Sequence, residues 1–222
     1  YAEAASKALA DVSGIPVVLS TNLIEATWDT GAYVQTSGVL KRIAVKLSKI
    51  CNDLRLLSSG PRTGINEINL PRLQPGSSIM PGKVNPVIPE VVSQVAFDII
   101  GKDVTITMAA EAGQLELNVM EPIIAFSLAN GIHRLRQAMR TLQDRCVSGI
   151  TANKERCRSM VENSIGIITA LNPYLGYETS ASIAKEALET GGSVLDIVLA
   201  RNLLSREKLD DILAPEHMIN RK

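Results

Sequence analysis

The 222-residue sequence lacks the features by which several protein classes are recognised. No charge is in surplus, since 23 Lys and Arg residues balance 23 Asp and Glu residues, and aromatic residues make up only 3%. A general nucleic-acid binder would need a basic surface and flat rings for base stacking. No apolar stretch approaches the roughly 18 residues of a membrane-spanning helix, and no signal-peptide pattern opens the chain. We therefore expect neither a nucleic-acid partner nor a membrane partner.

Cysteine and histidine are also scarce. The three cysteines, Cys51, Cys146 and Cys157, form no CxxC pair, which predicts reduced thiols in a cytoplasmic protein. The two histidines, His133 and His217, lie far apart in the sequence, so a histidine-rich metal site is not expected. What remains is a mostly aliphatic chain whose composition is typical of folded proteins.

Helical patterning dominates the sequence. Strong helix formers open the chain and stop at Gly14, a long helix is predicted from about residue 25 to 57, and another starts near Pro89. Apolar residues step by fours and threes along two seams, which consist of Ile43, Leu47, Ile50, Leu54 and Leu57, and of Ile124, Leu128, Ile132, Leu135, Met139 and Leu142. This pattern predicts an all-α fold built on a long-helix bundle. Seams of this length leave apolar surface uncovered in a monomer, so we expect an oligomer.

The pattern changes near residue 150. Beyond it the predicted helices are short (154–163, 180–189 and 205–213) and are separated by glycine and proline. We predict that residues 1–149 belong to a central helical-bundle domain and that residues 150–222 form a small C-terminal helical domain. The first residue is Tyr1, and helix formers follow it with no N-cap ahead of them, which suggests the C-terminal part of a longer protein.

A long segment rich in glycine and proline, from Gly60 to Asn85, separates two of the predicted helices. Such long connections are usually functional. It ends in GSSIMPGKVNP, residues 76–86, which combines two serine hydroxyls, a lysine and an asparagine amide with flexible glycines, just before a helix N-terminus. These groups suit a small dianion, and the GxxxxGK[ST] spacing of a nucleotide loop is absent. The residues alone predict an anion-binding loop, although such a segment is also common as a plain connection.

The same residues resemble the fumarase/aspartase superfamily of lyases, whose signature loop reads GSSxMPxKxNP. The stretches VIPE at 87–90 and QLELNVMEP at 114–122 are similar to the aspartase branch rather than the fumarase branch. Within the second stretch, Glu116 and Asn118 could contact substrate or serve a structural role between helices. The resemblance covers the whole chain and implies the all-α fold, a homotetramer, and active sites that combine residues of three subunits.

The resemblance implies a β-elimination in which L-aspartate loses ammonia to give fumarate. Ser77 would be the general base that removes the Cβ proton, on a mobile loop that closes over the substrate. Glu90 would support a histidine relay whose histidine lies outside this sequence. No cofactor and no metal are implied.

The resemblance also implies how the dicarboxylate substrate is held. Lys83 and Asn85 would bind the α-carboxylate. Ser78 and the backbone N–H groups around Ile79 and Met80 would bind the β-carboxylate, whose charge grows in the transition state. Because other site residues are missing, we expect the chain to be inactive alone. Class II fumarate hydratase and a catalytically incomplete helical assembly module remain the alternatives.

Overall fold

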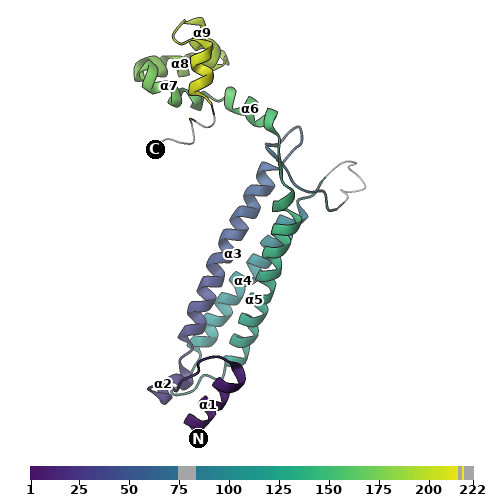
Figure 1. Cartoon of the computed structure of the whole chain (residues 1–222), viewed down its shortest axis with the longest axis vertical. Coiled ribbons are helices and arrows are strands. Elements are labelled where there is room, and N and C mark those ends of the chain that lie inside the picture. Colours follow the sequence, from purple (N-terminus) through teal and green to yellow (C-terminus); the bar gives the residue numbers. More distant parts are fainter. Residues whose placement is uncertain (75–83, 215–216, 218–222) are drawn as a thin grey trace. The chain divides into compact units, whose positions relative to one another are not determined.

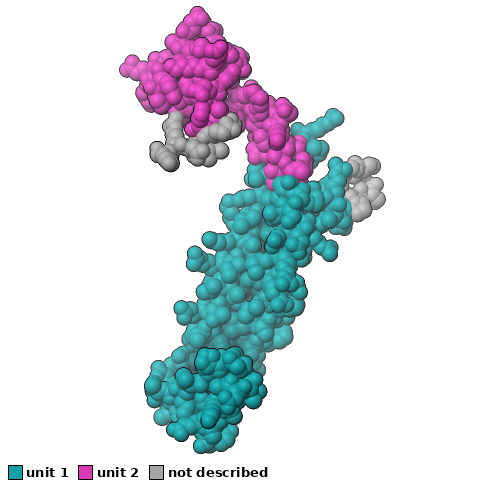
Figure 2. Space-filling model, in the orientation of Figure 1, with its two compact units in different colours: residues 1–65, 70–150 teal, residues 66–69, 151–222 magenta. Residues whose placement is uncertain are grey.

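The computed structural model describes residues 1–74, 84–214 and 217 of the chain. The chain forms two compact units, one of residues 1–65 and 70–150 (unit 1) and one of residues 66–69 and 151–222 (unit 2) (Figure 2). Most described residues are helical, which confirms the predicted all-α class. Across the described ranges, none of the helices combines the length and apolar content that crossing a membrane requires.

Unit 1 begins with two short helices. Helix α1 (Ala2–Ser13) ends at Gly14, whose left-handed backbone (φ 67°) closes the last turn, as the sequence predicts. Helix α2 (Leu23–Trp28) is capped by the Asn22 side chain, which accepts hydrogen bonds from two backbone N–H groups of the first turn.

The prediction of one helix from about residue 25 to 57 is wrong at its start. Helix α2 stops at Asp29, which is extended, and α3 (Gly31–Leu57) begins anew after Thr30. The Asp29 carboxylate accepts a hydrogen bond from the backbone N–H of Gly31 at 2.9 Å. Aspartate that bonds the backbone two residues on favours a turn over a continuous helix, and this local signal overrides the helical pattern around it.

Three long helices form the body of unit 1, namely α3, α4 (Val87–Glu111) and α5 (Glu121–Arg145). They lie side by side (Figure 1) and bury an apolar core in three clusters along their length. On α5 the buried residues Ile124, Leu128, Leu135 and Leu142 belong to the predicted seam. Ile132 and Met139 of that seam are exposed, because the smaller residues Gly131 and Ala138, one position earlier, occupy the buried positions between the leucines.

The buried stripe of α3 is not the predicted seam. Its buried residues are the small ones, Ser37, Ala44, Ser48 and Cys51, whereas Ile50 is exposed. Small side chains let neighbouring helices approach closely, and the larger residues of the predicted seam flank this contact half-buried. A prediction based only on the large apolar residues therefore put the centre of the buried face of α3 in the wrong place.

A buried polar contact joins α3 to α4. The carboxylate of Asp103 accepts hydrogen bonds from the Ser37 hydroxyl at 2.8 Å and from the Lys41 ammonium at 2.6 Å. Burial raises the pKa of the Asp103 carboxyl, but these two donors outweigh burial and hold that pKa below its ordinary value. The carboxylate is thus charged at neutral pH and fixes the register of the two helices.

The turn between α4 and α5 is organised by Asn118, which is 2% exposed. Its amide donates to the carbonyls of Ala109 and Ala110 at the end of α4, and its Oδ1 accepts from the Met120 N–H at the start of α5. One side chain thereby satisfies unpaired backbone groups of two helix ends. This geometry favours the structural role of Asn118 over substrate contact, and Glu116 is exposed in the same turn.

Unit 2 consists of a two-stranded antiparallel pair, β1 (Ile68–Asn69) with β2 (Thr151–Ala152), and short helices. The helices are α6 (Lys154–Glu162), α7 (Ile168–Leu175), α8 (Tyr177–Thr190), α9 (Val194–Ala200) and α10 (Arg206–Ile212). Their core includes Leu171, Ile183, Val198 and Leu209. The sequence predicted α6, α8 and α10 but not α7 or α9.

The two omissions have local causes. Pro173 was interpreted as helix punctuation, but it lies inside α7, within the last turn. Helix α9 has only seven residues, and its apolar run carries no helical period of its own. Gly191 ends α8 in a left-handed conformation (φ 69°), just beyond the predicted helix 180–189.

Candidate functional site

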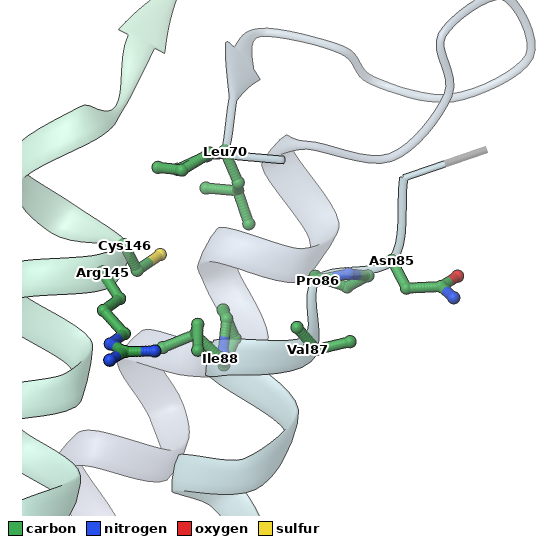
Figure 3. Close-up of a pocket in the computed structure, with 9 residues that line it drawn as sticks. Leu70, Asn85, Pro86, Val87, Ile88, Arg145 and Cys146 are labelled. Carbon is green, nitrogen blue, oxygen red and sulfur yellow. The ribbon is translucent and has the colours of Figure 1, made fainter. Parts of the chain in front are cut away.

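The end of the signature sequence lies at a small pocket of unit 1. Leu70 and Pro71 line the pocket from the segment before the signature sequence, and residues 85–89 line it from the end of the signature sequence and the start of α4. Arg145 and Cys146, at the end of α5, complete the lining (Figure 3). The pocket therefore marks where the segments on either side of residues 75–83 pack against the bundle. We call residues 70–71 the first stem and residues 84–86 the second stem.

Five of the predicted site residues lie outside the described part of the chain. They are Ser77, Ser78, Ile79, Met80 and Lys83. Asn85 and Glu90 are described, and both lie at the start of α4.

Asn85 is half-buried directly before α4. Its backbone carbonyl accepts the Val87 N–H at 2.9 Å, which turns the chain into the helix. Its side chain points away from Arg145 and Cys146 (Figure 3). Among the described residues the amide has no hydrogen-bond partner.

The start of α4 favours an anion. The N-cap is Pro86, which supplies no side-chain hydrogen bond to the first turn. A helix of 25 residues carries about half a positive charge at such an end, within the first turn. Asn85 therefore presents its amide beside a positive helix end, which suits a carboxylate.

Glu90 is half-buried in the first turn of α4, and its backbone N–H bonds to the Pro86 carbonyl at 3.1 Å. Neither described histidine pairs with it: His133 is exposed on α5, and His217 bonds to Asp211. The support of a histidine relay by Glu90 stays a prediction.

The floor beneath the pocket is apolar. Cys51 and Cys146 share one buried cluster with Val92 and Leu142, and Leu70 and Ile88 pack against it. Burial, and secondarily the neighbouring Cys146, raises the pKa of the Cys51 thiol to about 11, and burial raises the pKa of Cys146. Both thiols remain protonated at neutral pH and behave as small hydrophobic side chains.

Close packing also holds the first stem. A Cβ atom on Gly149 would lie 2.6 Å from Cγ of Pro71, so only glycine allows this approach. The sequence analysis missed Pro71, Gly149 and Arg145 as parts of the site region. Nothing in their spacing marks them, because only tertiary packing brings Pro71 and Arg145 to the pocket beside Asn85, and Gly149 to Pro71.

The chain matches two protein-family models, the one described as Lyase over residues 1–101 and the one described as Fumarase C C-terminus over residues 167–220. It is 62% identical over 220 residues to aspartate ammonia-lyase of Helicobacter pylori, covering 99% of this chain and 47% of the relative. Against aspartate ammonia-lyase of Escherichia coli K12 the identity is 58%, over 99% of this chain and 46% of the relative. The chain thus spans about half the length of the curated relatives it matches.

The chain is also similar in structure to solved lyases. The crystal structure of cobalt-bound fumarate lyase:delta crystallin from Brucella melitensis matches with a TM-score of 0.93 and 55% identity, over 98% of this chain and 47% of that one. Class II fumarase from Schistosoma mansoni matches with a TM-score of 0.85 and 34% identity, over 96% of this chain and 48% of that one.

Proposed function

Because the chain belongs to the lyase family of aspartase and fumarase, we propose that it supplies part of the active site of an aspartate ammonia-lyase. The reaction is the reversible elimination of ammonia from L-aspartate to give fumarate. The observation that carries the proposal is the 58% to 62% identity to aspartate ammonia-lyases over 99% of the chain. Every fixed residue of the lyase signature is also present in GSSIMPGKVNP.

In the proposed mechanism Ser77 takes the Cβ proton of L-aspartate. The electron pair left on Cβ spreads into the β-carboxylate, which becomes an enediolate-like dianion, and then forms the double bond as the Cα–N bond breaks. Nitrogen leaves as ammonia. Ser78 and the N–H groups around Ile79 and Met80 stabilise the charge that grows on the β-carboxylate. Such a donor contributes about 2.7–4 kcal/mol when it is aimed at developing charge.

The α-carboxylate is assigned to Lys83 and Asn85. The half-buried Asn85, with an amide that has no partner among the described residues beside an uncapped helix end, supports this assignment. Serine is a weak base, so its alkoxide must be stabilised by nearby cations and amide donors. Lys83 supplies the cation, and Glu90 supports the site from the first turn of α4.

We further propose that the active protein is a homotetramer with composite sites. The bundle of unit 1 exposes large apolar side chains along its length, among them Val39, Val45, Phe97, Val104, Met108 and Phe126. Burying them against other copies removes a penalty of about 25 cal/mol for each Å² of apolar surface. Since each composite site also needs residues that this chain lacks, the chain alone is expected to be inactive.

The test is a comparison of substrates with the protein expressed from its complete gene. We expect efficient fumarate formation, followed by its ultraviolet absorbance, from L-aspartate and little from L-malate. Efficient fumarate formation from L-malate alone would replace the proposal with fumarate hydratase, which the 34% identity to Schistosoma mansoni fumarase keeps as the second candidate. Turnover of neither substrate by a folded oligomer would favour a helical assembly module without catalysis.

A further inference from the structure

Charge is unevenly distributed along the bundle of unit 1. Val34 packs against the apolar cluster of Ile106 at one end of the bundle. Cys51 and Cys146 share a cluster at the other end, where the pocket lies. We call these halves the turn end, residues 23–40 and 104–132, and the pocket end, residues 41–57, 86–103 and 133–145.

The turn end is acidic. Its sequence contains no lysine or arginine. Its carboxylate residues are all exposed, namely Glu25, Asp29, Glu111, Glu116 and Glu121. Helix α1 of the same unit adds Glu3 and Asp11 against Lys7, so it does not offset this charge.

The pocket end is basic. Its lysines and arginines are Lys41, Arg42, Lys46, Lys49, Arg55, Lys102, Arg134, Arg136, Arg140 and Arg145. Its carboxylate residues are half as many, namely Asp53, Glu90, Asp98, Asp103 and Asp144. At neutral pH the two halves therefore carry net charges of equal size and opposite sign, and the bundle as a whole carries none.

The two halves of one copy do not neutralise each other. Helix α4 has 25 residues, and a helix of that length extends for about 37 Å. The Debye length is about 8 Å at physiological ionic strength, so charges at opposite ends of one bundle are screened from each other. Among the described residues, Glu111 and Glu121 of the turn end and Arg136 and Arg140 of the pocket end have no ion-pair partner.

An exposed apolar surface extends over both halves. Phe97 of the pocket end and Val104, Met108 and Phe126 of the turn end are each more than half exposed. A patch of this kind marks an interaction surface, because covering it removes apolar area from water. The occupant of this surface must therefore match an acidic region at one end and a basic region at the other.

A second copy of the chain has this charge pattern when its bundle is reversed. Two parallel bundles would place acidic side chains against acidic ones and basic side chains against basic ones. Two antiparallel bundles place each turn end against a pocket end. Since a two-fold pair uses the same patch on both copies, each of these contacts forms twice.

We propose that two copies pair through this surface with their bundles antiparallel, so that the acidic turn end of each lies against the basic pocket end of the other. Apolar contact supplies most of the affinity, and charge selects the direction. This inference rests on the assembly included in the proposed function. It adds the orientation of one pair of copies and the dependence of that pairing on salt.

The test reverses charge at each end separately in the protein expressed from its complete gene. The acidic-end variant combines Glu111→Lys with Glu121→Lys, and the basic-end variant combines Arg136→Glu with Arg140→Glu. Either variant makes like charges face each other in both contacts of an antiparallel pair. We expect the protein concentration of half-dissociation, measured by light scattering at low salt, to rise about 10- to 100-fold.

Mixing the two variants should restore the pairing. The lysines of the acidic-end variant then face the glutamates of the basic-end variant, and the unchanged halves face each other as before. The half-dissociation concentration of the mixture should return to within about 3-fold of that of the unchanged protein. Different affinity tags on the two variants should show that the restored species contains both.

The matched control combines Glu178→Lys with Glu189→Lys, which gives the same change in net charge at exposed positions of α8. Its half-dissociation concentration should equal that of the unchanged protein. Salt provides a second check, because the Debye length falls to about 3 Å at 1 M. The deficit of each charge-reversed variant should therefore shrink as salt is added.

Unchanged dissociation of the acidic-end variant would overturn the inference, because parallel bundles would face like charges before and after the change. Failure of the mixture to recover would overturn it too. A lower melting temperature at unchanged mass would assign the surface to another segment of the same chain, which also contradicts pairing.

If a charge-reversed variant fails to fold, Glu111→Gln combined with Glu121→Gln decides by the same criteria, with a smaller expected rise. If the unchanged protein is a monomer, the proposed assembly itself fails. If the unchanged protein is an oligomer and the charge-reversed variants match it, only the antiparallel pairing fails. Fumarate formation from L-aspartate tests the proposed reaction independently of both.

Discussion

At the scale of single residues, the buried carboxylate and the buried thiols of unit 1 differ in whether they carry a charge at neutral pH. Asp103 keeps its charge because Ser37 and Lys41 donate to it. Cys51 and Cys146 stay protonated because burial raises the pKa of each thiol, and for Cys51 it outweighs the opposing effects of Ser93 and Arg55. Protein interiors accept a charge only when donors replace its water. The charge of Asp103 is tested by the pH dependence of stability, and the protonation of the thiols by their reaction with an alkylating reagent.

Asp103→Asn should lower the free energy of unfolding by about 1–3 kcal/mol at pH 7, because the Lys41 ammonium and the Ser37 hydroxyl lose a charged acceptor. The folded-state pKa of Asp103 is depressed, so its stabilisation is present above the ordinary carboxyl pKa of about 3.9 and is lost as pH falls through the depressed value. Denaturant titrations at several pH values should show the difference shrinking below about pH 4. Asp53→Asn, whose partner Lys49 is exposed, should change stability by less than about 1 kcal/mol. A pH-independent difference for Asp103→Asn would contradict the account.

Alkylation of the native protein at pH 7.5 should modify Cys157 first and leave Cys51 and Cys146 unmodified. The latter two are 0% and 1% exposed with raised thiol pKa values, whereas Cys157 is only half-buried. Peptide mass spectrometry after iodoacetamide treatment gives the order. Unfolding in denaturant should expose all three, and early modification of Cys146 in the native state would show that the pocket floor is open.

At the scale of elements, long patterned helices follow from the sequence and their exact contacts do not. The bundle helices, the Gly14 and Gly191 stops and three helices of unit 2 all agree with local signals. The spacing of apolar residues predicts neither the break at Asp29 nor the small-residue contact of α3, because in each case another effect is stronger. A turn bond outweighed helix propensity in the first case, and close approach outweighed apolar size in the second.

The contact between the first stem and the end of α5 has its own test. Gly149→Ala would place a Cβ atom 2.6 Å from Pro71, so the stem must shift. We expect a loss of about 1–3 kcal/mol in unfolding free energy, as for overpacking, together with lower kcat for L-aspartate. Gly101→Ala is the matched control, because a Cβ there meets nothing within 4 Å and should stabilise α4 by up to about 1 kcal/mol. Unchanged stability of Gly149→Ala would show that Pro71 is not held there.

At the scale of the whole molecule, the exposed apolar side chains of the bundle predict assembly. Replacing Phe97 and Phe126, which are 59% and 62% exposed, with glutamate should reduce the oligomer to smaller species, because charges would be buried between copies. Light scattering coupled to gel filtration measures the mass. Leu188→Glu, at an exposed position on α8 of unit 2, is the control and should leave the mass unchanged. Retention of full mass by the double phenylalanine variant would contradict assembly through this surface.

Only those residues of the candidate site that lie near one another in the sequence could be predicted from it. Asn85 and Glu90 are close because they are near in sequence, Asn85 just before α4 and Glu90 in its first turn. Pro71 and Arg145 come from distant segments, and tertiary packing alone brings them to the pocket beside Asn85. The division of the chain at residue 149 stays a prediction.

The proposed base gives the most direct test of the account. Ser77→Ala in the protein expressed from its complete gene should lower kcat for L-aspartate by about 10²- to 10⁴-fold, the usual contribution of a positioned general base. Oligomer mass and melting temperature should match those of Ser13→Ala, a change on an exposed side chain of α1. Full turnover by Ser77→Ala would remove Ser77 as the base and with it the central claim.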